Sequence, residues 1–187
     1  MDKNSIDILN FWFKEIKPKQ WFDKNSNFDN LIYSKFYDLH YKAINGKLNY
    51  WKNTLKESLA FIILIDQFSR NMFRENRLSF DYDYLALEFC NYGLMNKYLE
   101  EFNNFDEKLF FIMPLIHHED FNSQTKALNL LDNDLNKHPN YKTIHKFFYR
   151  HLEIIKIFGR FPHRNKILKR SSTKEELDFL KTPFSSF

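Results

Sequence analysis

Four polar residues follow directly on an apolar run in the segment LIDQFSRNMFR. The run Leu59–Ile65 has no polar side chain, and Asp66, Gln67, Arg70 and Asn71 come immediately after it. In a helix, Asp66 and Arg70 lie one turn apart, and so do Gln67 and Asn71. If the run is buried, these groups enter a partly buried polar pocket, where a charge needs a partner that a ligand could supply. The alternative is an exposed ion pair of small energetic value.

A second set lies in PLIHHEDFNSQ. In helical geometry His117, Asp120 and Gln124 share one face, whereas Glu119 points elsewhere. If Asp120 instead caps a following helix, His117 and Glu119 lie in a corner between two helices, where adjustable side chains often converge. The set fits a general acid/base pair, a metal site or a plain capped turn. The metal interpretation is not favoured, because neither His-Glu-x-x-His nor Glu-x-x-His spacing occurs.

The third set, GRFPHRNKILKR, is basic. Residues 160–170 hold five Arg and Lys side chains and no Asp or Glu, in a chain whose formal net charge is only +4. Gly159 should end the preceding helix, so that Arg160, His163 and Arg164 project from a short segment stiffened by a proline. Arginine forks bind carboxylate or phosphate, and histidine can add charge or move a proton. The alternatives are a solvated turn, or arginines that cap the carbonyl end of the helix.

Helical periodicity and cap signals recur along the chain, whereas the alternation typical of strands does not. The expected helices cover approximately residues 5–16, 26–45, 54–73, 81–96, 106–114, 121–136 and 139–158, with a last one that begins at 173. Pro114 should bend or end the fifth helix. Thr54 with Glu57, and Thr173 with Glu176, form capping-box patterns. The helix from Thr54 is apolar on nearly every side, which predicts a central position.

These elements predict an all-α fold. Residues 1–187 should form a single domain of about seven to eight helices, arranged as an antiparallel helical array. We also expect Phe184 and Phe187 in the tail to pack back on the chain. Cys90 is the sole cysteine, which excludes an internal disulfide and indicates a reducing compartment. No segment is apolar and long enough for a signal peptide or a bilayer span, so we expect a cytoplasmic protein without membrane contact.

Over essentially its whole length, the chain resembles the bacterial family known as domain of unknown function 924. The resemblance rests on ILNFWF, WF, LAFIILIDQFSRNMFR, PLIHHEDFNSQ, FGRFPHRNKIL and the C-terminal pattern of Ser, Glu and Phe. It implies an all-helical fold similar to tetratricopeptide-repeat proteins. It implies little about chemistry, because the family has no assigned function, and no cofactor or metal is expected.

The polar pattern of that family maps onto the three sets and adds residues to them. The matching positions are Asp66, Gln67, Arg70, Asn71, His117, Glu119, Asp120, Gln124, His151, Arg160, His163, Arg164 and Asn165. Four positions depart from the expected pattern, with His118 in place of serine, Ile112 of tyrosine, Ile157 of arginine and Lys169 of glycine. The change at His118 leaves open any role for a serine hydroxyl there.

We interpret the three sets as one compact pocket that binds a small ligand bearing phosphate or carboxylate. His117, Glu119 and His163 are the catalytic candidates. The ligand-binding candidates are Asp66, Gln67, Arg70, Asn71, Asp120, Gln124, His151, Arg160, Arg164 and Asn165. The hypothesis predicts that these groups meet around one cavity. A hydrolase or transferase would suit such a site, and the sequence leaves open whether any reaction takes place.

Two other classes of function fit parts of the sequence. A helical-repeat shape would favour a module that binds a peptide or a protein, although shape alone is an analogy. RNA, for example a tRNA-like molecule, could bind through residues 160–170. The modest net charge and the core spacing of the aromatic residues make RNA the less favoured partner.

Overall fold

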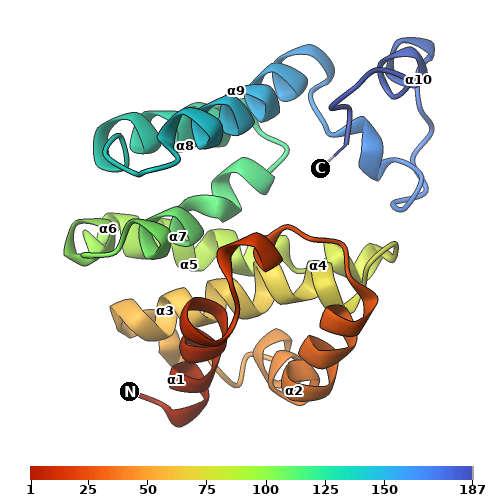
Figure 1. Ribbon diagram of the computed structural model, residues 1–187. Helices are drawn as coiled ribbons and strands as arrows, with labels where there is room; N and C mark the ends of the chain where they lie inside the picture. The colour runs from red at the N-terminus through yellow and green to blue at the C-terminus, as the bar shows by residue number, and fades with distance from the viewer. Residues whose placement is uncertain (187) are drawn as a thin grey trace. The chain divides into compact units, whose positions relative to one another are not determined.

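The computed structural model describes residues 1–186, and all regular structure within them is helical. The α-helices are α1 (Lys3–Asn10), α2 (Ser26–Ile44), α3 (Leu55–Ile62), α4 (Phe68–Met72), α5 (Asp83–Met95), α6 (Tyr98–Glu101), α7 (Phe105–His117), α8 (Phe121–Asp134), α9 (Tyr141–Phe158) and α10 (Lys174–Phe179) (Figure 1). The 3-10 and π turns are η1 (Phe11–Glu15), η2 (Pro18–Trp21), η3 (Asn49–Asn53), η4 (Ile63–Gln67), η5 (Arg77–Ser79) and η6 (Pro162–Arg164). The predicted all-α class is confirmed.

Each predicted helix is present, and the differences are local. The short helix α6 was not predicted, and α7 continues through Pro114 to His117, so the proline does not end it. The Thr173–Glu176 capping box forms as expected. Thr54 does precede α3, but its hydroxyl donates to the Glu57 carboxylate at 2.6 Å rather than capping the helix.

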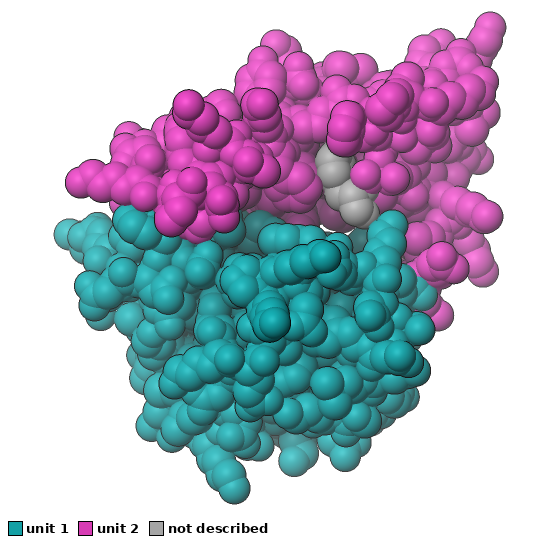
Figure 2. All heavy atoms as spheres, viewed as in Figure 1, with its two compact units in different colours: residues 1–74, 78–114 teal, residues 75–77, 115–187 magenta. Residues whose placement is uncertain are grey.

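The described chain divides into two compact units (Figure 2). Unit 1 comprises residues 1–74 and 78–114, and unit 2 comprises residues 75–77 and 115–187. The division falls inside α7, at Pro114. The prediction of a single domain stays a prediction, and so does the similarity to tetratricopeptide repeats.

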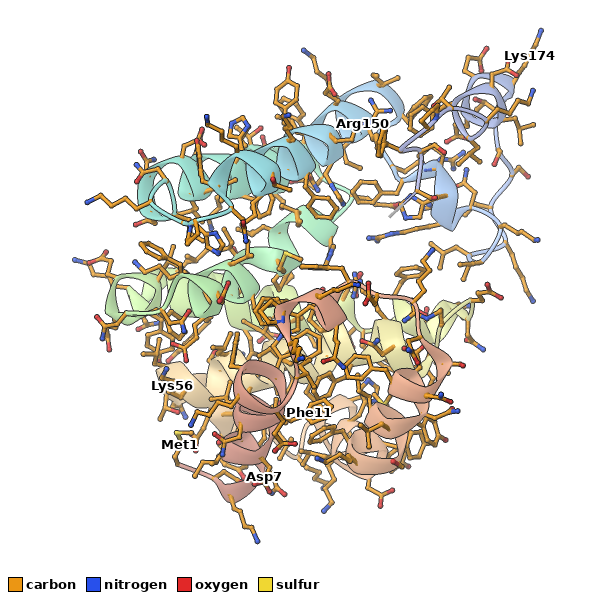
Figure 3. All side chains as sticks on the ribbon, in the orientation of Figure 1. Met1, Asp7, Phe11, Lys56, Arg150 and Lys174 are labelled. Atoms are coloured by element: carbon orange, nitrogen blue, oxygen red, sulfur yellow. The ribbon has the colours of Figure 1, made fainter. Side chains whose placement is uncertain are left out.

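Unit 1 is built around the apolar helix that begins after Thr54. All residues from 57 to 69 are buried, which confirms its central position. In Figure 1, α3 and α4 pass between α1 and α2 on one side and α5 on the other, and residue contacts join the same helices. Aromatic rings fill the interior, for example Phe11 (labelled in Figure 3), which packs edge-on against Phe36 and Phe68. Burial of these rings provides much of the driving force for folding of the unit.

Gly93 on α5 lies in close contact with the rings of Phe111 and Tyr98 in unit 1. A Cβ there would collide with the ring of Phe111 and lie 2.8 Å from the ring of Tyr98. We expect Gly93→Ala to lower the free energy of unfolding by about 2 kcal/mol, because overpacking a filled interior forces neighbours to move. Urea unfolding followed by circular dichroism measures the change. A stabilised variant, as helix propensity alone would give, would contradict this result.

Unit 2 contains the antiparallel pair α8 and α9, which lie side by side (Figure 1). Gly159 ends α9 with φ 68°, the left-handed conformation predicted for it. Ile154, Ile155 and Phe161 then form a buried core, against which Phe158 and Phe179 pack. This core anchors the segment that leads into the basic stretch.

Two C-terminal positions bear on expectations from the sequence. Lys169 has φ 55°, a conformation that favours glycine, which is the residue the family pattern leads us to expect there. Phe184 is 81% exposed, so the prediction that it packs back on the chain is wrong. The same prediction for Phe187 lies outside the described residues. Among the residues that the structure describes, no helix is long and apolar enough to cross a membrane.

Candidate functional site

The first predicted set lies at the end of the buried helix of unit 1. In η4 the helix widens to a π turn that ends with Asp66 and Gln67, a feature that is frequent at functional sites. Asp66 is fully buried, and its Oδ1 lies 3.2 Å from the guanidinium of Arg70. Arg70 also forms a two-point ion pair with Asp83 at 2.9 and 3.0 Å, and Gln67 donates to Asp66 at 2.6 Å. Asp66 and Gln67 are therefore buried, and Arg70 is half-buried.

The charges in this network stabilise one another. Burial would lower the pKa of Arg70, but Asp66 and Asp83 raise it above its ordinary value. Arg70 thus stays charged beside two carboxylates. Such a network can stabilise the fold as readily as it can bind a ligand.

Asn71 belongs to a neighbouring network of the same unit. It donates to Asp29 Oδ1 at 2.8 Å, and Arg74 donates to both oxygens of Asp29 at 2.7 and 2.8 Å. Sequence reasoning missed Asp29 and Asp83 as partners. Asp29 is 42 residues from Asn71, and no local pattern signals the contact.

The second set forms the corner between α7 and α8 in unit 2. Asp120 caps α8 by accepting the backbone N–H of Ser123 at 2.8 Å, which is the capped-turn alternative. The buried Gln124 donates to the backbone carbonyls of Ile116 and His118 at 2.7 and 2.8 Å. His118 is exposed, and its Nδ1 lies 2.9 Å from the hydroxyl of Ser123. Asp120 and Gln124 therefore shape the corner.

His151 on α9 is 2% exposed, and its environment fixes its tautomer. Its Nδ1 lies 2.8 Å from the carbonyl oxygen of Phe147. Because a carbonyl only accepts, Nδ1 carries the proton. Burial holds the pKa of His151 well below its ordinary value, and positive charge on His117, Arg164 and His163 lowers it further. His151 is therefore neutral and lies in a positive electrostatic potential.

Cationic and imidazole groups gather around the buried ring of Phe161. The guanidinium of Arg164, only 6% exposed, lies over this ring at 4.7 Å. The rings of His151 and His163 lie 5.3 and 5.7 Å from it. We call Arg164, His151 and His163, together with His117, which acts electrostatically on His151, the Phe161 cluster. All belong to unit 2.

Glu119 connects this cluster to the basic stretch. Its two oxygens accept hydrogen bonds from the guanidinium of Arg170 at 2.6 and 2.9 Å, and Oε1 also accepts the backbone N–H of Phe161 at 2.8 Å. Burial would raise the pKa of Glu119, but the bonds from Arg170 and Phe161 outweigh it and lower the pKa. Glu119 is thus an ionised carboxylate that accepts three hydrogen bonds.

Arg160 and Asn165 meet at a second carboxylate, that of the buried Glu176 on α10. Arg160 donates to both of its oxygens at 2.7 and 2.9 Å, and Asn165 donates to one at 3.1 Å. The hydrogen bonds from Arg160 are the main cause that lowers the pKa of Glu176 to about 2. Burial opposes this shift, while the backbone N–H of Thr173 and the amide of Asn165 add to it. The guanidinium of Arg160 is therefore engaged by Glu176 on α10.

Within unit 2, the structure brings most predicted residues into one connected region. His117, His151, His163 and Arg164 form the cluster, Glu119 adjoins it, and Asn165 and Arg160 lie in the supporting network. The four predicted residues of unit 1 have their own networks. That both sets share one cavity stays a prediction. Phe161, Arg170 and Glu176 were not among the predicted site residues, although the first two lie in the basic stretch that drew attention.

Two further observations limit the kinds of site. No group of three or more His, Cys, Asp and Glu side chains within residues 1–186 is arranged to hold a metal ion. A surface depression of about 570 Å³ on unit 1 is lined by Tyr41, Lys42, Asn45 and Lys47, none of which was predicted. Its lysines lie at the carbonyl end of α2, where cations commonly stabilise the helix dipole.

Comparison with known proteins places the chain in a family. The model of a family described as "Bacterial protein of unknown function (DUF924)" matches residues 8–184. The protein belongs to this family. It is also similar to a solved structure of a protein of unknown function, ATU0120 from Agrobacterium tumefaciens, with 36% identity and a TM-score of 0.83. The match covers 95% of this chain and 96% of that one. No curated protein matches the chain significantly.

Membership of the DUF924 family confirms the resemblance drawn from the sequence motifs. The match includes all three polar sets, since they lie between residues 66 and 170. The family description assigns no activity, so function has to be argued from the site.

Proposed function

We propose that the protein binds a small anionic ligand, bearing phosphate or carboxylate, at the Phe161 cluster. The observation that carries the proposal is the buried guanidinium of Arg164, which lies over the ring of Phe161 that His151 and His163 also contact. Arginine remains charged at any physiological pH, and its fork matches carboxylate and phosphate oxygens. An anion placed in the positive potential that acts on His151 would be stabilised.

The cluster also suits proton transfer to or from a bound anion. Histidine is the side chain that most often acts as general acid or base, so His117 or His163 could fill that role in a hydrolase or transferase reaction. Glu119 was a catalytic candidate as well, but its engagement with Arg170 and Phe161 suits a supporting role better. A contribution from Asp66 and Arg70 is a further part of the proposal, independent of the cluster.

The alternative functions place their ligands elsewhere. A peptide-binding module with a tetratricopeptide-like shape would use an extended surface, such as the exposed Tyr33, Tyr37 and Tyr41 on α2. RNA would need the basic stretch, yet Arg160 and Arg170 are paired with carboxylates, which leaves Lys166 and Lys169 as its exposed cations. We place the protein in the cytoplasm, as the single buried cysteine favours.

Arg164→Leu tests the proposal. With inorganic phosphate as the probe, we expect the variant to bind about 30-fold more weakly than the wild type, since a charge-assisted hydrogen bond contributes about 1.5–3 kcal/mol. Phosphate titrations followed through the imidazole C–H signals in NMR spectra give the dissociation constants. The matched control is Lys166→Gln, which removes an exposed charge of the same stretch and should change the affinity little.

Three outcomes would count against the proposal. If phosphate and small carboxylates leave the wild-type imidazole signals unchanged, the proposal is wrong. Equal losses in Arg164→Leu and Lys166→Gln would indicate diffuse attraction to a basic surface. Tight, strongly salt-dependent binding of single-stranded RNA that depends on Lys166 would favour the RNA alternative.

A further inference from the structure

We infer that the ion pair of Glu119 with Arg170 is the positioning element of the Phe161 cluster, through which the C-terminal segment 165–180 controls anion binding without touching the anion. The inference rests on the proposed function for its ligand, but its geometry can be tested without one. It gives Glu119 a positioning role in place of the catalytic role expected from the sequence.

The ion pair binds both polar backbone groups of Phe161. The N–H of Phe161 donates to Glu119 Oε1 at 2.8 Å, and its carbonyl oxygen accepts from Arg170 at 3.2 Å. Glu119 and Arg170 are joined by two hydrogen bonds of their own, at 2.6 and 2.9 Å. Phe161 lies outside regular secondary structure, and these two side chains bond its backbone N–H and its carbonyl oxygen. Three segments, separated by as many as 51 residues, are fixed to one another.

Phe161 in turn sets the positions of the groups that would meet the anion. Its ring is fully buried and contacts Arg164, His151 and His163 at centroid distances of 4.7, 5.3 and 5.7 Å. Arg164 and His163 follow Phe161 within one turn of η6, so a rotation of this turn would move both. Small errors in the placement of binding groups are costly, because hydrogen bonds weaken steeply with distance and angle.

Arg170 is itself held in place by hydrogen bonds within the C-terminal segment 165–180. Its Nε donates to the side-chain oxygen of Asn165 at 2.9 Å. The amide of Asn165 donates to Ser172 at 3.0 Å and to Glu176 at 3.1 Å. Glu176 closes the network through the Thr173 cap and Arg160. A continuous series of hydrogen bonds therefore leads from α10 to Glu119 and Phe161, all within unit 2.

The engagement of Glu119 argues against its use as a general base. A proton on Glu119 would remove the negative charge that its hydrogen bonds from Arg170 and the Phe161 backbone stabilise, and would so weaken the contacts that hold the cluster. Arg170 is likewise committed to four acceptor atoms, on Glu119, Asn165 and Phe161. The pair suits the role of a fixed support.

The test compares Glu119→Gln and Arg170→Gln in the full chain with the wild type. Without any ligand, we expect both variants to shift the imidazole C–H signals of His151 and His163, because the ring current of Phe161 acts on both. With inorganic phosphate, we expect about tenfold weaker binding, as is typical when the outer partners of binding groups are removed. Lys181→Gln is the control, since it breaks an exposed ion pair with Asp178 in the same tail. It should leave signals and affinity unchanged.

Arg170→Lys is a second variant, for the case that Arg170→Gln does not fold. It keeps the charge but loses the fork, so a folded protein with shifted signals and intermediate affinity is expected. Unchanged imidazole signals and unchanged phosphate affinity in folded Glu119 and Arg170 variants would overturn the inference while leaving the proposed function intact. If the wild type binds neither phosphate nor a small carboxylate, the proposed function fails. Shifted signals in the ligand-free variants would then still support the positioning role, and unshifted ones would refute it.

Discussion

Replacing Arg70 with methionine should lower the free energy of unfolding by about 3–5 kcal/mol, one of the largest single effects expected in this protein. The variant leaves the fully buried carboxylate of Asp66 and the partly buried one of Asp83 without the guanidinium that lies about 3 Å from each. Removing one partner of a buried ion pair is costly, because the desolvated charge that remains loses its compensation. Methionine preserves most of the side-chain length, so lost packing contributes little.

Urea unfolding monitored by circular dichroism measures this effect, and unit 1 offers a matched control. Lys35 pairs with Glu15 at 3.3 Å, and both side chains are exposed. Lys35→Met should therefore cost less than about 1 kcal/mol. If the two variants lose the same stability, the ion pairs of Arg70 would not stabilise the fold as buried ion pairs do. The groups of this network would then be better candidates for ligand binding.

The helices could be predicted from the sequence because their signals are local. The apolar run before Asp66 predicts a central helix, and all residues from 57 to 69 are indeed buried. The box of Thr173 and Glu176 lies within four residues and forms as predicted. Thr54 and Glu57 have the same pattern, but Glu57 also accepts the backbone N–H of Asp2, which is 55 residues away. The pattern alone does not reveal that competitor.

The candidate site could be predicted only in part, because its charges find partners over long sequence separations. Arg70 was expected to face Asp66, four residues away, and it does. Its two-point partner, Asp83, lies 13 residues away, beyond a turn that carries no signal of the contact. Similarly, the basic stretch contains five cations in the sequence, but Glu176 and Glu119 engage Arg160 and Arg170. The charge that a ligand meets is therefore smaller and more localised than the sequence suggests.

This pairing separates the arginines of the basic stretch by role. The guanidinium groups of Arg160 and Arg170 are engaged by carboxylates, whereas Arg164 is buried against the ring of Phe161, which His151 and His163 also contact. Spacing along the sequence cannot make that distinction, since all three lie within eleven residues. The three-dimensional partners of each guanidinium decide which one is a candidate for anion binding.

Acid should destabilise unit 1 through His40, the second large effect expected. His40 on α2 is 1% exposed and contacts the rings of Phe73 and Tyr82. Its Nε2 lies 2.8 Å from the hydroxyl of Ser69. Burial lowers its pKa from 6.5 to about 4. As the pH falls below 6.5, the unfolded chain takes up the proton before the folded one does, so folding becomes less favourable. The loss accumulates between pH 6.5 and 4 and amounts to about 3 kcal/mol, at about 1.4 kcal/mol for each pKa unit.

The contribution of His40 can be isolated by comparing the wild type with His40→Gln, which can still form a hydrogen bond with Ser69 but does not titrate. Urea unfolding at pH 7 and pH 4 gives the stability lost by each protein. The variant should lose about 3 kcal/mol less than the wild type over this range, because the other titrating groups, including the buried His151, act equally in both. Equal losses in the two proteins would mean that His40 accepts a proton in the folded state near its ordinary pKa. The interior between α2 and α4 would then have to admit water to the imidazole.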